Sequence, residues 1–340
     1  MKESINVYIE GFIYVKHICI GVPKNKAEEI RKKLIEKNLI SKEFKVIRDE
    51  RYVYFPVREE IEIENCIICE KDFEYIKRES YKDILASKGI RSPLSIDIIG
   101  DIAILRGDEE NLKEIADAII SSNKHIKSVF YDRGVYDECR LRDIEFVAGE
   151  RRTETIHNEY GIKIKLDISK VYFSPRLANE RMRIAKMVRE NEIVIDMFAG
   201  VAPFSLLIAK FSKAEKIFAI DKNTHAVKYA RENILLNKIK NIEIIEGDAR
   251  HVLPSLPFAD HIIMNLPHKS FEFLPLAVEK GKILHFYEII ERKKVEERIE
   301  EIKEKIRQEG YDAEIKNIRI IGNYSPSKYK VGMELFIKKF

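Results

Sequence analysis

Apolar and polar positions follow one pattern up to about residue 170 and a different one after it. In the later part, short apolar runs alternate with stretches that have the apolar spacing of amphipathic helices. The expected strands cover residues 193–198, 216–220, 242–245 and 261–264, and the expected helices end near residue 211 and cover residues 223–236. Strands of this kind that alternate with helices are typical of a parallel, doubly wound sheet with both faces covered. The sequence therefore predicts a Rossmann-like α/β domain over residues 171–340.

The first 170 residues predict two smaller α/β (α+β) domains, placed at residues 1–67 and 68–170. The elements expected in the first are a strand over 14–22, a helix over about 25–37 and a hairpin of strands 44–47 and 52–57. The elements expected in the second are two strands within 95–105, a helix over 111–121 and a strand over 162–168. Residues 142–155 are highly charged, and we expect a loop there.

Composition limits the class of protein. The chain has 340 residues, of which 45% are hydrophobic and 35% charged with both signs mixed, so folded domains are favoured over disorder. Four Cys argue against a disulfide scaffold. The chain shows neither a signal-peptide pattern nor the run of roughly 18 apolar residues that a membrane span needs, so we expect a cytoplasmic protein. A net charge of +4 permits a polyanionic partner without requiring one.

Each of the four expected parallel strands ends in a polar or turn-forming tip. The tips carry Asp196, Asp221, Asp248 and Asn265. A single Asp at such a place is often only a helix cap, but ligands bind where the carboxyl ends of parallel strands meet. Asp221 is placed to accept hydrogen bonds from ribose hydroxyls and Asp248 from an exocyclic amine, and Gly200 lets the backbone approach a ligand closely. Both G-x-G-x-x-G and the P-loop pattern are missing, which favours an adenosine cofactor without a pyrophosphate, namely S-adenosylmethionine.

Four segments carry a resemblance to a known family. They read RLRDIEFVAGERRT (140–153), VYFSPRLANER (171–181), DMFAGVAPF (196–204) and NLP (265–267). Together they resemble the archaeal and eukaryotic tRNA (guanine-37 N1)-methyltransferases, over roughly residue 18 to the C-terminus. The resemblance implies a methyltransferase fold at the C-terminus and methylation of N1 of guanosine 37, next to the anticodon. It also implies a tRNA partner, a monomer and no obligatory protein partner.

The resemblance also implies roles for individual residues. Glu180 is the expected general base for the N1 proton, Arg140 the donor to guanine O6, and Asn265 the residue that holds the guanine edge. We expect partial burial to raise the pKa of Glu180. The expected cofactor contacts are Arg181, Asp196, Phe198, Ala199, Gly200, Val201, Asp221, Lys222, Asp248, Ala249 and Asn265. The expected contacts to the substrate are Tyr172, Arg176 and Pro267.

Some features depart from the family or stand apart from it. Ala202 takes the place of a usual Gly and is expected to reshape the methionine end of the pocket. His268, just after the NLP element, either lines the site or has a structural role. Cys66 and Cys69 have the spacing of a metal-ligand pair, but no matching second pair is present in the sequence, so we expect no metal site there. Mg²⁺ is associated with the family's methyl transfer, and the sequence indicates no site for it.

The tRNA contacts are expected from distributed positive charge. The basic residues of the first expected helix are Lys24, Lys26, Arg31, Lys32, Lys33 and Lys37. In the family this domain contacts the outer corner of the tRNA, while the other domains hold the anticodon arm.

Three alternatives stay open. One is a bifunctional enzyme that also methylates the wyosine precursor 4-demethylwyosine, although the NLP element argues against the related aminocarboxypropyl transfer. Another is a non-catalytic tRNA-binding relative with a vestigial cofactor site. The third is a small-molecule methyltransferase, which has no need of a large basic N-terminal region.

Overall fold

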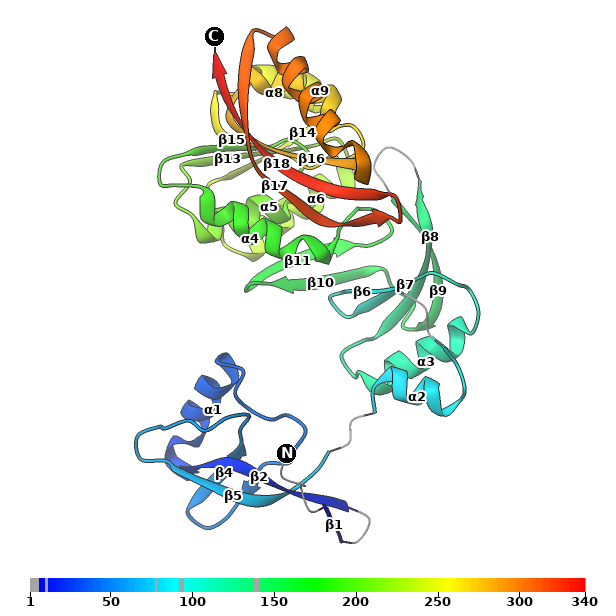
Figure 1. Cartoon of the computed structure of the whole chain (residues 1–340), viewed down its shortest axis with the longest axis vertical. Helices are drawn as coiled ribbons and strands as arrows, with labels where there is room; N and C mark the ends of the chain where they lie inside the picture. The colour runs from blue at the N-terminus through cyan, green and yellow to red at the C-terminus, as the bar shows by residue number, and fades with distance from the viewer. Residues whose placement is uncertain (1–5, 10–11, 77–78, 92–94, 137–140, 340) are drawn as a thin grey trace. The chain divides into compact units, whose positions relative to one another are not determined.

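The computed structural model describes residues 6–9, 12–76, 79–91, 95–136 and 141–339 (Figure 1). The chain divides into two compact units, Met1–Ile84 and Leu85–Phe340. Each unit is described by itself below. In the described part of the chain, no helix combines the length and the apolar character that a membrane crossing needs.

The first unit is one antiparallel sheet covered by a helix. Its strands are β1 Asn6–Ile9, β2 Phe12–Pro23, β3 Ile47–Arg48, β4 Tyr52–Pro56 and β5 Ile67–Glu74, and its helix is α1 Ala27–Glu36. β2 pairs with β1, β4 and β5. The apolar face of α1 buries Ile30 and Leu34 against Ile20 and Val22 of β2, so the expected strand, helix and hairpin are present. Because β5 pairs with β2 as far as Glu74, the sheet continues past the boundary expected at residue 67.

The second unit begins with a four-stranded sheet in the order β6-β7-β8-β9. Its elements are β6 Ser95–Ile99, β7 Ile102–Arg106, α3 Leu112–Ser122, β8 Ser128–Tyr136 and β9 Leu141–Gly149; α2, Tyr81–Ser87, lies at the division between the units. The strand pair and the helix agree with the sequence, but the loop expected over 142–155 is wrong, since β9 pairs with β8. The segment is highly charged and was therefore expected to be an exposed loop. Arg142 is nevertheless buried, because Asp132 of β8 neutralises it.

A hairpin, β10 Glu154–Glu159 and β11 Ile162–Asp167, joins this sheet to the rest of the unit. Ile162, Ile164 and Leu166 alternate with polar residues and are fully buried. They share one hydrophobic cluster with Ile102 of β7 and with Phe204 of helix α5, Pro203–Phe211. The middle region and the C-terminal sheet of the second unit therefore share one core.

The largest sheet has seven strands in the order β14-β13-β12-β15-β16-β18-β17. Its strands are β12 Ile193–Asp196, β13 Lys216–Asp221, β14 Ile242–Glu246, β15 Ala259–Met264, β16 Gly281–Glu291, β17 Tyr311–Ser325 and β18 Lys328–Lys339. Strands β12 to β16 are parallel, whereas β18 runs antiparallel to both of its neighbours. The strand order reverses beside β12, which lies between β13 and β15, and this is where doubly wound sheets bind ligands.

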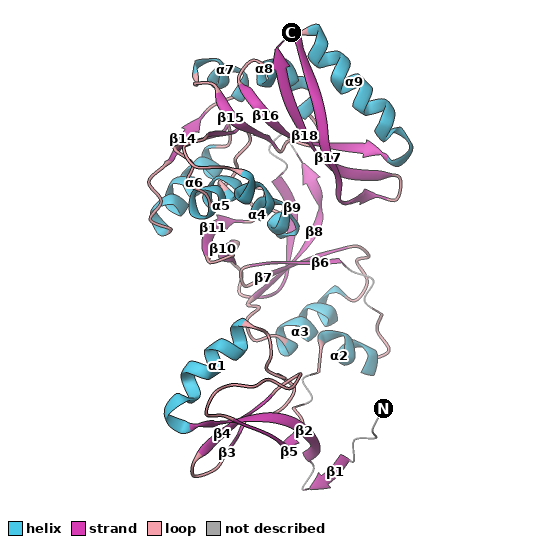
Figure 2. Cartoon of the chain, turned by 60° about the vertical axis from the view of Figure 1, so that its left-hand side comes forward, coloured by secondary structure: helices cyan, strands magenta, loops and turns pink. Residues whose placement is uncertain are grey.

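Helices cover both faces of this sheet (Figure 2). They are α4 Ala178–Met187, α5 Pro203–Phe211, α6 Thr224–Leu236, α7 Ala249–Val252, α8 Leu274–Val278 and α9 Val295–Gln308. Neighbouring residues of β12 show the two faces: Val194 belongs to the cluster that contains α5 and α6, and Ile195 to the cluster that contains α8 and α9. The prediction of a doubly wound, Rossmann-like domain is confirmed.

Candidate active site

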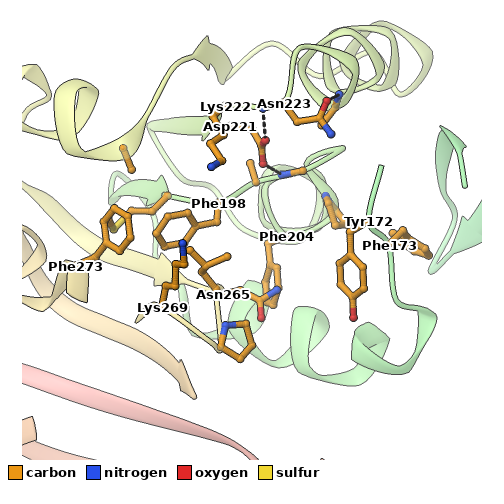
Figure 3. Close-up of a pocket in the computed structure, with 18 of the residues that line it drawn as sticks. Tyr172, Phe173, Phe198, Phe204, Asp221, Lys222, Asn223, Asn265, Lys269 and Phe273 are labelled. Atoms are coloured by element: carbon orange, nitrogen blue, oxygen red, sulfur yellow. Dashed lines mark hydrogen bonds between the residues drawn. The ribbon is translucent and has the colours of Figure 1, made fainter. Parts of the chain in front are cut away.

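A pocket lies at the carboxyl ends of β12, β13, β14 and β15, where the sequence placed four polar tips (Figure 3). The expected site residues that line it are Tyr172, Arg181, Phe198, Ala199, Gly200, Asp221, Lys222, Asp248, Ala249, Asn265 and Pro267. Figure 3 shows Phe198 and Phe273 on one side of the pocket and Tyr172 on the other. The pocket thus brings together most of the residues that the sequence singled out, from segments about 100 residues apart.

Asp221, the last residue of β13, presents a carboxylate that the backbone holds in place. Its Oδ2 accepts a hydrogen bond of 2.6 Å from the amide of Gly200, and its Oδ1 accepts one of 2.8 Å from the amide of Asn223. Burial raises the pKa of Asp221, although the two amides act in the opposite direction. Since each oxygen has two lone pairs, the carboxylate keeps acceptor capacity for a ribose hydroxyl.

The backbone conformation of Gly200 makes its hydrogen bond to Asp221 possible. Its φ of +56° is a left-handed conformation that side chains rarely adopt. The loop after β12 can therefore turn back so that its amide reaches Asp221 while its backbone stays at the pocket surface.

Asp248 follows β14 and caps the short helix α7. Its side chain accepts a hydrogen bond from the amide of Arg250, and both carboxylate oxygens contact the Arg250 guanidinium, at 3.0 and 2.7 Å. The side-chain hydrogen bond from Arg250 lowers the pKa of Asp248 to about 2. Asp248 thus fills the capping role that we considered as the alternative, and it also borders the pocket.

Asn265 stands after β15 and faces Lys330 of β18. The Lys330 ammonium donates a hydrogen bond of 3.2 Å to Oδ1 of Asn265. Because an ammonium can only donate, this contact assigns the amide: its oxygen faces Lys330 and its NH₂ group points elsewhere. Lys330 lines the same pocket but lies 65 residues further along the chain.

Arg181 and Tyr172 belong to the opposite wall. The guanidinium of Arg181 is almost fully buried; its Nε donates to Glu159 Oε1 at 2.7 Å and its Nη1 to the carbonyl of Ser174 at 3.2 Å. Arg142 lies 5.7 Å from the ring of Tyr172 and donates a 3.0 Å hydrogen bond to the carbonyl of Phe173. These arginines hold the segment before α4 in position.

Four expected site residues that the structure describes do not line the pocket: Asp196, Val201, Arg176 and Glu180. Asp196 is buried and accepts a hydrogen bond of 2.8 Å from the Ser205 hydroxyl, and Val201 is buried and its carbonyl accepts a hydrogen bond from Asn233. Arg176 pairs with Asp97 at 2.7 Å, and Glu180 lies in the first turn of α4. Arg140, the expected O6 donor, falls outside the described residues.

Glu180 lies in a network of charges that the sequence did not indicate. Its Oε1 accepts hydrogen bonds from Tyr287 and Arg183, both at 2.8 Å, and Arg319 lies 3.3 Å away. Burial raises the pKa of Glu180, but the hydrogen bond and charge of Arg183, with Tyr287 and Arg319, outweigh burial and hold it below the usual glutamate value. The expectation of a raised pKa is therefore wrong, since burial came with two arginines.

Ala202 does not line the pocket. Its side chain is fully buried and it precedes α5 with a φ of +63°. A left-handed conformation costs a non-glycine residue about 1–2 kcal/mol. This backbone requirement accounts for Gly as the usual residue, and the expected effect on the methionine end of the pocket stays a prediction.

Several lining residues were not predicted. They are Phe173, Ser174, Leu177, Met197, Pro203, Phe204, Asn223, Ala226, Gly247, Arg250, Leu266, Lys269, Glu272, Phe273 and Lys330. Asn223 and Gly247 directly follow strand tips, and this position could have indicated them. The ring of Phe273 packs edge-on against Phe198, 4.9 Å between centroids, and no motif marks it.

The lining fits an adenosine-bearing sulfonium cofactor. The partly buried Asp221 offers acceptors for a diol, Phe198 and Phe273 offer flat apolar walls, and Asp248 offers an acceptor for an amine. Among the described residues, no group of three or more His, Cys, Asp or Glu is arranged to hold a metal ion. Cys69 lies on β5, where its sulfur is 3.2 Å from that of Cys19.

Comparisons with known proteins agree with this architecture. Family models match in three consecutive parts: the tRNA methyltransferase 5 N-terminal domain over residues 19–65, the TYW2 N-terminal domain over 78–153 and the TRM5/TYW2 methyltransferase domain over 155–314. The tRNA (guanine(37)-N(1))-methyltransferase Trm5b of Pyrococcus abyssi is 40% identical over 330 residues, which cover 93% of this chain and 98% of that protein.

Two solved structures are similar. A complex of aTrm5 and tRNALeu has a TM-score of 0.69 and 35% identity, covering 94% of this chain and all of that one. The Methanocaldococcus jannaschii TYW2 in complex with AdoMet has a TM-score of 0.56 and 30% identity, covering 72% of this chain and all of that one. Full-length similarity, together with the Trm5-type N-terminal domain, shows that the chain belongs to the Trm5 family of tRNA methyltransferases.

Proposed function

We propose that the protein transfers a methyl group from S-adenosylmethionine to N1 of guanosine 37 in tRNA. The observation that carries this proposal is that one pocket holds both the diol acceptor Asp221 and the side chain of Asn265. A methyl donor and a target base bound by these residues share one cavity, which is what methyl transfer requires. The Trm5b relative, similar over nearly its whole length, supports guanine N1 as the target.

The cofactor would be held by residues from the ends of two strands, β12 and β13. Asp221 would accept the ribose hydroxyls, the backbone of Gly200 and Ala199 would border the cofactor, and Phe198 would offer its ring to the adenine. S-adenosylmethionine, when bound, supplies an electrophilic methyl group on its sulfonium. The residues at this end of the pocket orient that methyl group toward the target base and exclude water from it.

The guanine is held at the other end of the pocket. Asn265 and Pro267 lie on one wall and Tyr172, whose ring offers a stacking face for an extruded base, on the other. Guanine N1 bears a proton at neutral pH, so methylation needs a group to accept it. We assign this role to Glu180 and the stabilisation of charge on O6 to Arg140, in line with the family resemblance.

The network around Glu180 bears on this assignment. A lowered pKa keeps the carboxylate ionised and able to accept a proton, while it makes the carboxylate a weaker base. Tyr287, Arg183 and Arg319 all bind Oε1 of Glu180, whereas the hydrogen bond to Oε2 comes from Nε of Arg183, so Oε2 keeps an acceptor position for the N1 proton when guanine enters. Arg183 and Arg319 also bind Glu334, so they have a second carboxylate when Glu180 turns away.

We further propose that tRNA binding is divided among three domains, expected at residues 1–67, 68–170 and 171–340, the first of which extends to the end of β5 at Glu74. The first presents the exposed basic side chains of α1 to the outer corner of the tRNA, and the other two hold the anticodon arm. The solved complex of a family member with tRNALeu supports tRNA as the partner. The monomeric state, the cytoplasmic location and a contribution of Mg²⁺ stay predictions.

A transfer assay tests the proposal. Label from S-adenosylmethionine is expected in tRNA transcripts with guanine at position 37 and to be lacking in transcripts with adenine there. Equal labelling of both, or of neither, would contradict the proposal. A parallel reaction on tRNA that carries 4-demethylwyosine distinguishes the bifunctional alternative, because only a bifunctional enzyme labels it.

A further inference from the structure

Two exposed aromatic side chains meet beside the pocket without lining it. The ring of His268 and the ring of Tyr324 are 5.4 Å apart between centroids, at an angle of 73°. His268 lies in the chain between Pro267 and Lys269, which both line the pocket. Tyr324 comes from the end of β17 and is 49% exposed. We call these two residues the aromatic pair.

The backbone of the hairpin directs Tyr324 to this place. Asn323 of β17 pairs with Tyr329 of β18, and Ser325 pairs with Lys328, so that Tyr324 is an extra residue without a partner in the register. Such a β-bulge turns a side chain out of the regular alternation and is common next to active sites. Arg292, which directly follows β16, packs over Tyr329 at 4.4 Å and donates a hydrogen bond of 3.3 Å to Asn323. One arginine therefore holds both strands at the bulge.

Lysines lie close to the aromatic pair along the chain. Lys269 directly follows His268 and lines the pocket with Lys330, and Lys328 pairs with Ser325 in the hairpin and is exposed. Exposed aromatic rings combined with lysines are the chemistry that binds unpaired nucleotides, because bases stack on the rings and phosphates pair with the ammonium groups.

We propose that the aromatic pair is a stacking site for the unpaired nucleobase adjacent to the methylated one. This inference rests on the proposed function. A base that enters the pocket leaves the stack of its loop, and the face of its neighbour then lies open at the mouth of the pocket. The aromatic pair covers that face and so keeps the target base from returning to its stack.

A cycle between protein and RNA variants tests this inference. Tyr324→Ala is measured on transcripts with guanine 37 that carry either an intact nucleotide or an abasic one at position 36 or at position 38. Stacking of one base is worth about 5- to 100-fold in affinity. We expect Tyr324→Ala to weaken tRNA binding by a factor in this range on intact transcripts, and to have no effect when the stacked base is missing. His268→Ala is expected to show the same dependence.

Two matched variants separate stacking from structural effects. Tyr324→Phe keeps the ring and should bind within about twofold of the wild type, whereas Ile320→Ala, exposed on the same strand at 60%, should leave the binding unchanged on every transcript. Affinity for S-adenosylmethionine should not change in any of them. An equal loss on intact and abasic transcripts, or no loss with Tyr324→Ala, overturns the inference. Because the readout is tRNA affinity, it stays interpretable even if guanine 37 is not methylated, which would refute the proposed function alone.

Discussion

The phenol of Tyr287 on β16 donates a hydrogen bond of 2.8 Å to the carboxylate of Glu180 on α4, 107 residues earlier in the chain. Tyr287 is buried, and burial raises its pKa well above the usual value, so the phenol stays protonated and can only donate toward Glu180. The hydrogen bond joins α4, the helix that carries the proposed base, to strand β16 of the large sheet. The carboxylate of Glu180 therefore anchors α4 as well as being the proposed base.

Replacing Glu180 by Gln should slow the chemical step without weakening tRNA binding. A positioned base contributes about 10²- to 10⁴-fold, so the single-turnover rate of methyl transfer should fall at least 100-fold at saturating substrate. Glu288→Gln is the matched control, since Glu288 of β16 also binds an arginine, Arg298, but has no hydrogen bond to the residues that bind Glu180. A rate for Glu180→Gln equal to that of the control removes Glu180 as the base.

Asp221→Asn should weaken the binding of S-adenosylmethionine by about tenfold or more, since removing a partner from a buried polar contact costs roughly 1–3 kcal/mol. The new NH₂ group has to face one of two backbone donors, the amide of Gly200 or that of Asn223. Calorimetric titration measures the affinity, and tRNA affinity should not change. Asp260→Asn is the control. The Asp260 carboxylate accepts a hydrogen bond from the amide of Ile193 and does not line the pocket, so we expect cofactor affinity to stay unchanged in this variant. Equal cofactor affinity in both variants contradicts the role of Asp221.

Asp196 should make the protein less stable as the pH rises. Burial raises its pKa to about 7, whereas an unfolded Asp titrates near pH 3.9. A carboxyl group with a raised folded pKa contributes stability that is complete below the unfolded pKa and is lost as the pH rises through the folded pKa. Relative to the wild type, Asp196→Asn should therefore gain unfolding free energy between about pH 4 and 7, by a few kcal/mol in total. Urea unfolding at pH 5 and pH 8 measures this, and a difference that does not depend on pH refutes it.

Lys330 and Asn265 should act as one unit. Lys330→Met removes the ammonium that donates to Oδ1 of Asn265, so we expect the single-turnover rate on guanine-37 tRNA to fall by about tenfold. In an Asn265→Ala background the same replacement should have little further effect, since the group that Lys330 orients is gone. Effects that multiply independently would show that Lys330 acts by itself.

The sequence could predict the sheet and the cofactor end of the site because both depend on local signals. The four strand tips follow apolar runs, and Asp221, Gly200 and Asn265 all came from this pattern. Lys330 could not be found in this way, because only the antiparallel pairing of β18 with β16 brings it beside Asn265.

The partly wrong predictions have a common cause. Glu180 was expected to have a raised pKa, but Arg319, 139 residues away, joins Arg183 in binding it. Arg142 was expected in a loop, but Asp132 on the neighbouring strand neutralises it and lets it be buried. In each case a partner distant in sequence changed the environment of a charged side chain, and neither periodicity nor spacing carries that information.

Methyl transfer to N1 of guanosine 37 is tested by identifying the methylated atom. A guanine-37 transcript is reacted with the enzyme and S-adenosylmethionine, digested to nucleosides and analysed by chromatography and mass spectrometry against methylguanosine standards. We expect 1-methylguanosine at position 37 and no other methylated nucleoside. Methylation at N2 or N7 of guanine, or at a different position of the tRNA, contradicts it.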